Sequence, residues 1–240
     1  MRNVEECLST SHIEPTHMRQ LSALTRLQAF QTWLSSHSFS SALLIQGHSN
    51  QDDVHTPLSY LCARLIKKYS KGRHVTVLHY FCSLRPGVQQ RRANTSTIIS
   101  EMIGQLLTDM RLASCFGRNL LTRKDIQRIR SRDLESLCRV FFSLLHRLQG
   151  RNLTIFCIID SISLYELNSG REATRTFLLA LRRFLNSRTG NTREDDRAPV
   201  FKLLVTDWGS VRVAYSMFKE REVLHMNQDL DEGIEDDVKI

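Results

Sequence analysis

The feature that most constrains the fold is an apolar run that ends in a carboxylate. Residues 153–160 read Leu-Thr-Ile-Phe-Cys-Ile-Ile-Asp, without the alternation of apolar and polar side chains that marks a strand with one wet face. This run predicts a strand covered on both faces, at the centre of a parallel sheet. Asp160 then lies at the carboxyl edge of that sheet, where open α/β sheets bind their ligands.

Strand-like and helix-like segments alternate along the rest of the chain. Apolar runs predict strands over residues 41–47, 75–82, 153–160, 200–206 and 222–226. Helical spacing of apolar residues predicts helices over residues 18–35, 58–69, 96–110, 134–150 and 173–186. This alternation indicates right-handed βαβ units. We therefore expect an α/β fold of three layers, with a mostly parallel sheet of roughly five strands between the helices.

Length and composition are those of a globular chain. The 240 residues, of which 41% are hydrophobic and 24% charged, predict one domain and exclude a mainly disordered protein. We divide them into a helical segment, 1–38, a domain, 39–228, and an acidic tail, 229–240. No apolar run approaches the ~18 residues of a membrane span, and a secretory signal is not seen. The six cysteines form no C-x-x-C pair, which favours reduced core thiols and a cytoplasmic location.

The charge is unevenly distributed. The net charge is +8, although the tail carries six acidic residues against one lysine. The densest basic patch consists of Arg118, Arg123, Lys124, Arg128, Arg130 and Arg132. Aromatic residues do not interleave with this patch, so a solvated basic face is favoured over a nucleic-acid interface. A basic nucleic-acid-binding protein is kept as one alternative.

The loop after the first predicted strand is where phosphate would bind. A working loop, G-x-x-x-x-G-K-[ST], needs glycines to curl round the phosphates, a lysine and a hydroxyl. Counted from Gly47, the second glycine and the lysine are Asp52 and Asp53; two inserted residues place His55 and Thr56 on the lysine and the hydroxyl instead. Neither alignment supplies a permanent cation. Two like charges at ~4 Å repel by about 4 kcal/mol at an effective dielectric constant of 20, which opposes a bound polyphosphate.

The same loop has the residue types of a metal site. His48, Asp52, Asp53 and His55 lie close together in the sequence. Their spacing is no known zinc signature, so a solvated polar loop is the favoured interpretation.

Seven short stretches follow one another in an order that is similar to a known family. They are Cys7–Thr10, Phe30–Leu34, Ala42–Gly47, Tyr80–Cys82, Ile98–Leu107, Phe156–Asp160 and Lys202–Thr206. Over residues 5–226 the chain resembles the NACHT-type branch of signalling P-loop NTPases, in the form common in fungal proteins. The resemblance implies a P-loop NTPase-like fold and makes Asp160 the counterpart of the magnesium-binding aspartate.

Two elements depart from the pattern of that family. The family usually places two acids three and four residues after the magnesium aspartate, where this chain has Ser163 and Leu164. Glu166 lies two residues late and is the one candidate for a catalytic base. The fourth strand of the family commonly runs into Thr-Ser-Arg, whereas this chain keeps Thr206 and replaces the arginine with Trp208.

The joint loss of lysine, second glycine and acid pair favours a non-catalytic, NACHT-like module that acts as an interaction or regulatory scaffold. Its partners would be other proteins or further copies of itself, and no cofactor is expected. Gly47, Thr56, Asp160 and Thr206 would then be vestiges of a nucleotide site. On this hypothesis Asp160 caps a turn or bonds to loop amides, and Glu166 is a surface loop residue.

The enzymatic alternative is an atypical NTPase that binds Mg-ATP or Mg-GTP. It would use Thr56 and Asp160 around the magnesium ion, and Glu166 as the base. Because the loop lacks a lysine, the missing cation would come from elsewhere, such as an arginine of a partner subunit.

Overall fold

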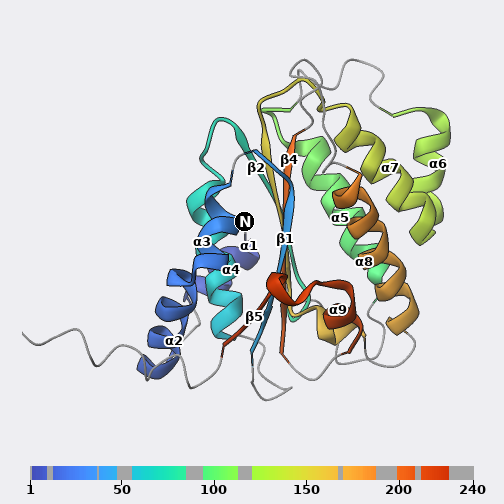
Figure 1. The fold of residues 1–240 in the computed structure, drawn as a ribbon. Coiled ribbons are helices and arrows are strands. Elements are labelled where there is room, and N and C mark those ends of the chain that lie inside the picture. Colours follow the sequence, from blue (N-terminus) through green and yellow to red (C-terminus); the bar gives the residue numbers. More distant parts are fainter. Residues whose placement is uncertain are drawn as a thin grey trace, which may run out of the picture.

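The computed structural model shows a sheet that lies between two layers of helices (Figure 1). It describes residues 2–9, 13–36, 38–47, 56–84, 94–112, 121–166, 170–187, 199–208 and 212–226. The fold is therefore of the α/β class, as the alternation of strands and helices predicted. Among the described residues, no helix is long and apolar enough to cross a membrane.

The sheet has five strands, all paired in parallel, in the order β2-β3-β4-β1-β5. The strands are β1 (Ser41–Gln46), β2 (Val75–Phe81), β3 (Thr154–Asp160), β4 (Val200–Asp207) and β5 (Val223–His225). This topology is consistent with a P-loop-like fold. The prediction that β3 is central was wrong, because β4 takes that place. A strand second from the edge is also covered by both helical layers, so continuous burial does not distinguish the two positions.

Four helices cover one face of the sheet. They are α1 (Arg2–Ser9), α2 (Pro15–Arg26), α3 (Gln28–Ser35) and α4 (Pro57–Tyr69). Residues 18–35 were predicted as one helix, but the extended backbone of Leu27, with φ −56° and ψ 135°, divides it into α2 and α3. The break turns Phe30 and Trp33 of α3 into the same core as Leu24 of α2. The apolar spacing alone did not reveal it.

A buried lysine ties α3 to the sheet. Lys202 of β4 has no exposed surface, and its Nζ donates to the Trp33 carbonyl at 2.6 Å and to Ser41 Oγ at 3.2 Å. Burial lowers its pKa to about 8. The N-terminal helices therefore share one core with the strands, while the proposed boundary at residue 38 stays a prediction.

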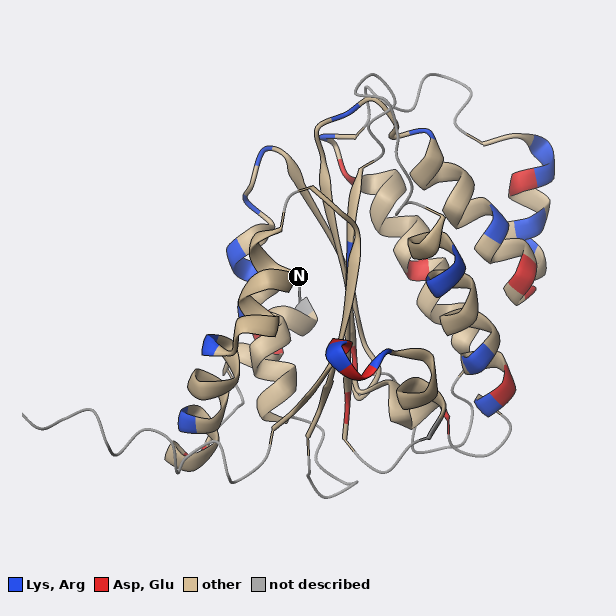
Figure 2. Ribbon diagram, in the orientation of Figure 1, with Lys and Arg blue, Asp and Glu red and all other residues tan. Residues whose placement is uncertain are grey.

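The other face is covered by α5 (Thr95–Thr108), α7 (Leu134–His146) and α8 (Arg171–Asn186), with α6 (Arg123–Ser131) outside them and α9 (Arg212–Met217) near the strand ends (Figure 1). Asp133 caps α7 and accepts a hydrogen bond from Ser136 N at 2.8 Å. Between the helices predicted over residues 96–110 and 134–150 lies a further helix, α6, which the apolar spacing did not predict and which begins at a capping box of Thr122 and Asp125. Figure 2 shows its basic residues on the outside of the molecule. The five described cysteines are buried, as expected of core thiols.

Candidate functional site

Asp160 is the centre of a buried network of hydroxyl groups at the end of β3. Its side chain has no exposed surface. Thr206 Oγ1 donates to Oδ1 at 2.7 Å, and Ser59 Oγ and Ser161 Oγ donate to Oδ2 at 2.7 and 3.2 Å. These donors come from β4, α4 and the turn after β3. Within the described residues the partners of Asp160 are therefore three hydroxyl groups, while the amides of loop residues 48–55, to which it was predicted to bond, lie outside the described residues.

The turn after β3 is held in a strained conformation by the same network. Ser161 has a φ of 58°, in the left-handed region that residues with a Cβ rarely adopt. Its N–H donates to Thr206 Oγ1 at 2.9 Å, while that oxygen donates its own proton to Asp160. Thr206 thus joins the ends of β3 and β4.

Thr56 belongs to this network only indirectly. It is the N-cap of α4, and its Oγ1 accepts from Ser59 N at 3.0 Å. The two hydroxyl oxygens lie 2.8 Å apart, and Ser59 donates to Asp160, so Thr56 is the donor to Ser59. The sequence alignment placed Thr56 beside Asp160, but Ser59 is the residue in contact. Ser59 was missed because the alignment with two inserted residues put the hydroxyl group at Thr56. In the structure the hydroxyl group that contacts Asp160 of β3 belongs to Ser59, the third residue of α4.

Burial raises the pKa of Asp160, and the hydrogen bonds from Thr206, Ser59 and Ser161 offset only part of that rise. The network therefore stabilises a carboxylate that is otherwise poorly solvated.

Asp207 is a second buried carboxylate, which the sequence analysis missed. It has no exposed surface, and neither of its oxygens forms a hydrogen bond of normal geometry within the described part of the chain. Burial raises its pKa to about 6, against an opposing effect of the nearby Ser163 and Gln46 side chains. The signal was present in the sequence: β4, like β3, is an apolar run that ends in aspartate.

Glu166 is buried, so its prediction as a surface loop residue was wrong. The chain after β3 forms a short 3-10 helix, η2 (Ile162–Tyr165), which carries Glu166 beneath the start of α9. Its two oxygens accept from Ala214 N at 3.0 Å and from Val213 N at 3.2 Å. Burial, and to a lesser extent the charge of Asp207, raise its pKa to about 7. Both oxygens are therefore committed to the backbone of α9.

Trp208 lies against Gly47, the first residue of the loop. A Cβ added to Gly47 would come within 2.6 Å of the indole, and Trp208 is 7% exposed. Gly47 N also donates to the Asp207 carbonyl at 2.9 Å. The tryptophan that replaces the arginine of the NACHT pattern thus packs against the residue that follows β1. His48, Asp52, Asp53 and His55 lie outside the described residues, and their metal site stays a prediction.

This contact predicts that Gly47→Ala destabilises the fold. The new methyl group overlaps the ring, and overpacking of this kind lowers the free energy of unfolding by about 1–3 kcal/mol. Gly104→Ala is the matched control, because nothing lies within 4 Å of a Cβ at that helical position. There the helix preference of alanine is expected to add up to about 1 kcal/mol. Urea unfolding followed by circular dichroism measures both; equal stability of Gly47→Ala and the wild type would contradict the contact.

Most of the chain matches a known protein family. Residues 21–206 match the family described as Nephrocystin 3, N-terminal. The chain belongs to this family. The matched region begins in α2 and ends at Thr206, so it contains every residue of the Asp160 network. A comparison with curated proteins gives no match.

The site of this Nephrocystin 3 N-terminal chain fits a magnesium ion only in part. The Ser59–Asp160 pair has the hydroxyl and carboxylate that hold magnesium in P-loop NTPases. Magnesium requires near-octahedral oxygen ligands and keeps several waters, whereas Asp160 presents no exposed oxygen. Among the described residues, no group of three or more His, Cys, Asp or Glu side chains is arranged to hold a metal ion. In this geometry the aspartate organises the ends of β3, β4 and α4.

Proposed function

We propose that this chain is a non-catalytic, NACHT-like P-loop module that serves as an interaction or regulatory domain. The observation that carries the proposal is the bonding of Asp160. Its carboxylate is fully buried, and both oxygens accept hydrogen bonds from hydroxyl groups of three different segments. An aspartate with this role stabilises the fold whether or not a nucleotide binds.

The charges around the loop support the proposal. Between Gly47 and Ser59 the sequence holds no lysine or arginine, but it holds Asp52 and Asp53. The adjoining strand ends add the buried carboxylates of Asp160 and Asp207. A nucleoside triphosphate would lack the lysine that neutralises its β- and γ-phosphates and would approach acidic residues instead.

Intact packing around an altered site points to a scaffold. Each face of the sheet has its own cluster of buried apolar side chains, so the fold does not depend on a ligand for its core. The same fold supports many functions, so the inference about catalysis rests on the residues of the site and not on the fold. Here those residues are altered, which favours a scaffold. The surfaces of the helices then carry the interactions of the domain.

Calorimetric titration of the full chain tests this proposal. We expect no saturable heat from Mg-ATP or Mg-GTP and no hydrolysis above the protein-free blank. Binding with a dissociation constant in the micromolar range, together with turnover, would overturn the proposal.

The Ser59–Asp160 pair favours one rival, an atypical NTPase. In that enzyme Ser59, rather than Thr56, would supply the magnesium-binding hydroxyl. Asp160→Ala and Ser59→Ala would then each abolish turnover, while Glu166→Gln, which retains an oxygen for the α9 cap, would lower it if Glu166 is the base. Turnover that survives both alanine substitutions would eliminate this rival.

A further inference from the structure

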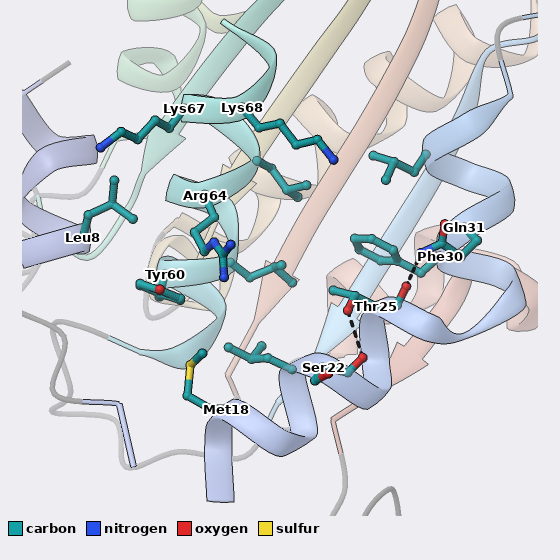
Figure 3. Close-up of a pocket in the computed structure, with 14 residues that line it drawn as sticks. Leu8, Met18, Ser22, Thr25, Phe30, Gln31, Tyr60, Arg64, Lys67 and Lys68 are labelled. Atoms are coloured by element: carbon teal, nitrogen blue, oxygen red, sulfur yellow. Dashed lines mark hydrogen bonds between the residues drawn. The ribbon is translucent and has the colours of Figure 1, made fainter. Parts of the chain in front are cut away.

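A groove runs along the outer surface of the N-terminal helical layer, away from the Asp160 network. It has a volume of about 940 Å³ and lies between α4 and the pair α2–α3, with Leu8 of α1 at one end (Figure 3). Its floor is apolar and consists of side chains that belong to the core of this layer, among them Leu21, Phe30, Leu61 and Leu65.

The rim of the groove is basic. Arg64, Lys67 and Lys68 are all exposed, and the lining includes no carboxylate. Figure 3 shows Arg64 and Lys68 extending from α4 toward α2 and α3, and Lys67 extending toward α1.

These three cations are weakly engaged within the described part of the chain. Arg64 lies 5.8 Å from the ring centre of Tyr60, and Lys68 lies 5.3 Å from that of Tyr69. Lys67 approaches Glu5 at 3.9 Å, in an ion pair between two exposed side chains. Exposed pairs of this kind contribute little, so the rim retains its attraction for an acidic ligand.

The C-terminal segment of this chain has the matching chemistry. Residues 229–240 contain six acidic residues. Leu230, Ile234 and Val238 are spaced by four, so a helical conformation would place them on one face. A helix this short, with Gly233 inside it, is marginal on its own and gains stability only when that apolar face is covered.

The described chain ends at Met226, on the side of the sheet that carries the groove. Met226, next to the end of β5, donates its N–H to the Gln46 carbonyl at 2.7 Å. Its side chain is buried in the same cluster as Leu21, Phe30 and Leu61 of the groove floor. Residues 227 and 228 alone join Met226 to this segment, so the tether is short. A short tether of this kind gives a local concentration in the millimolar range.

We propose that residues 229–240 dock in this groove as an amphipathic helix of the same chain. Leu230, Ile234 and Val238 cover the apolar floor, and the flanking carboxylates pair with Arg64, Lys67 and Lys68. The docked segment covers one surface that a partner protein would use, and the inference does not depend on whether the chain binds nucleotide.

Zero-length carbodiimide crosslinking of the 240-residue chain tests the proposal, because it joins carboxylates only to lysines in contact. We expect links from residues 229–237 to Lys67 and Lys68 and few to Lys124, an equally exposed lysine on α6. The double variant Arg64→Glu/Lys68→Glu is expected to reduce the links to Lys67 roughly fivefold. Ile234→Ser, which keeps every charge, is expected to reduce them as well.

The control separates docking from general attraction between an acidic tail and a basic body. Arg123→Glu/Arg130→Glu makes the same change of charge on α6 and should leave the links to Lys67 unchanged. Equal loss in both double variants would overturn the proposal, as would equal labelling of Lys124 in the wild type. Links that form only between two molecules, identified by mixing isotopically labelled and unlabelled chains, would also overturn it.

Discussion

Replacement of Asp160 by alanine is expected to lower the free energy of unfolding by about 2–4 kcal/mol. The substitution removes the acceptor of three buried hydroxyl groups, those of Ser59, Ser161 and Thr206. Hydrogen bonds to a charged acceptor contribute about 1.5–3 kcal/mol each, while burial of the carboxylate itself opposes them. The net loss of stability arises because the substitution leaves three buried hydroxyl donors without an acceptor, and each unsatisfied buried donor costs about 1–3 kcal/mol. Urea unfolding at neutral pH measures the difference.

Two further variants test whether the hydrogen-bond network of Asp160 is responsible for this loss of stability. Asp160→Asn keeps the shape and one acceptor oxygen, and its amide group can donate to the oxygens of Ser59 and Ser161, so a smaller loss is expected. Asp133→Ala removes an exposed helix cap and is expected to have the smaller effect of the two alanine substitutions. An Asp160→Ala protein as stable as the wild type would show that Asp160 does not organise the strand ends.

Replacement of Asp207 by asparagine is expected to stabilise the protein at about pH 8, by up to about 3 kcal/mol. Burial raises the pKa of Asp207 from 3.8 to about 6, a shift of roughly two units at about 1.4 kcal/mol each. The residue has no exposed surface, so solvent does not screen this cost. Asparagine has a similar shape and no charge, and therefore avoids the cost of burying an ionised group whose nearby donors do not offset its burial.

The sign of the pH dependence follows from the direction of the shift. Well below pH 3.8 Asp207 is protonated in both the folded and the unfolded state and imposes no penalty. As the pH rises toward about 6, the unfolded chain releases the proton while the folded chain retains it, so the wild type loses stability. Glu166, with its pKa raised to about 7, extends this loss to about pH 7.

Urea unfolding of the wild type and of Asp207→Asn between about pH 4 and about pH 8 tests this expectation. The two proteins should be close in stability at the acidic end and diverge as the pH rises, with the variant more stable. Asp207→Asn combined with Glu166→Gln should reduce the slope further, and the slope that remains includes the contribution of Asp160, whose pKa burial also raises. A wild type whose stability is constant over this range, or a variant that is less stable at about pH 8, would contradict the buried, unpartnered carboxylate.

Hydrophobic patterning predicted the sheet well. β3 and β4 are buried along almost their whole length because both faces are covered, and the mostly apolar residues that this requires are visible in the sequence. The same patterning did not reveal features that it does not encode, such as a break in the backbone or a helix without buried residues. Leu27 carries the apolar spacing of a helix although its backbone is extended, and α6 buries none of its residues, so it gave no apolar stripe to detect.

The sequence predicted the candidate site only in part, because some of its contacts depend on how the elements pack in three dimensions. Asp160 and Thr206 follow apolar strands, and the parallel sheet brings them into contact. Ser59 depends on how far α4 extends toward β3, and Glu166 on the turn that returns beneath α9; both are properties of three-dimensional packing. The sequence contains these residues but not the distances between them.

The central claim is that Asp160 stabilises the fold and does not serve a nucleotide. The most direct test is the free energy of unfolding with and without Mg-ATP. A ligand at about 100 times its dissociation constant adds about 2.7 kcal/mol to that free energy. At about 1 mM Mg-ATP, which is about 100 times a micromolar-range constant of ~10 μM, we predict no change for the wild type. Stabilisation near 2.7 kcal/mol that disappears in Asp160→Asn would contradict the account.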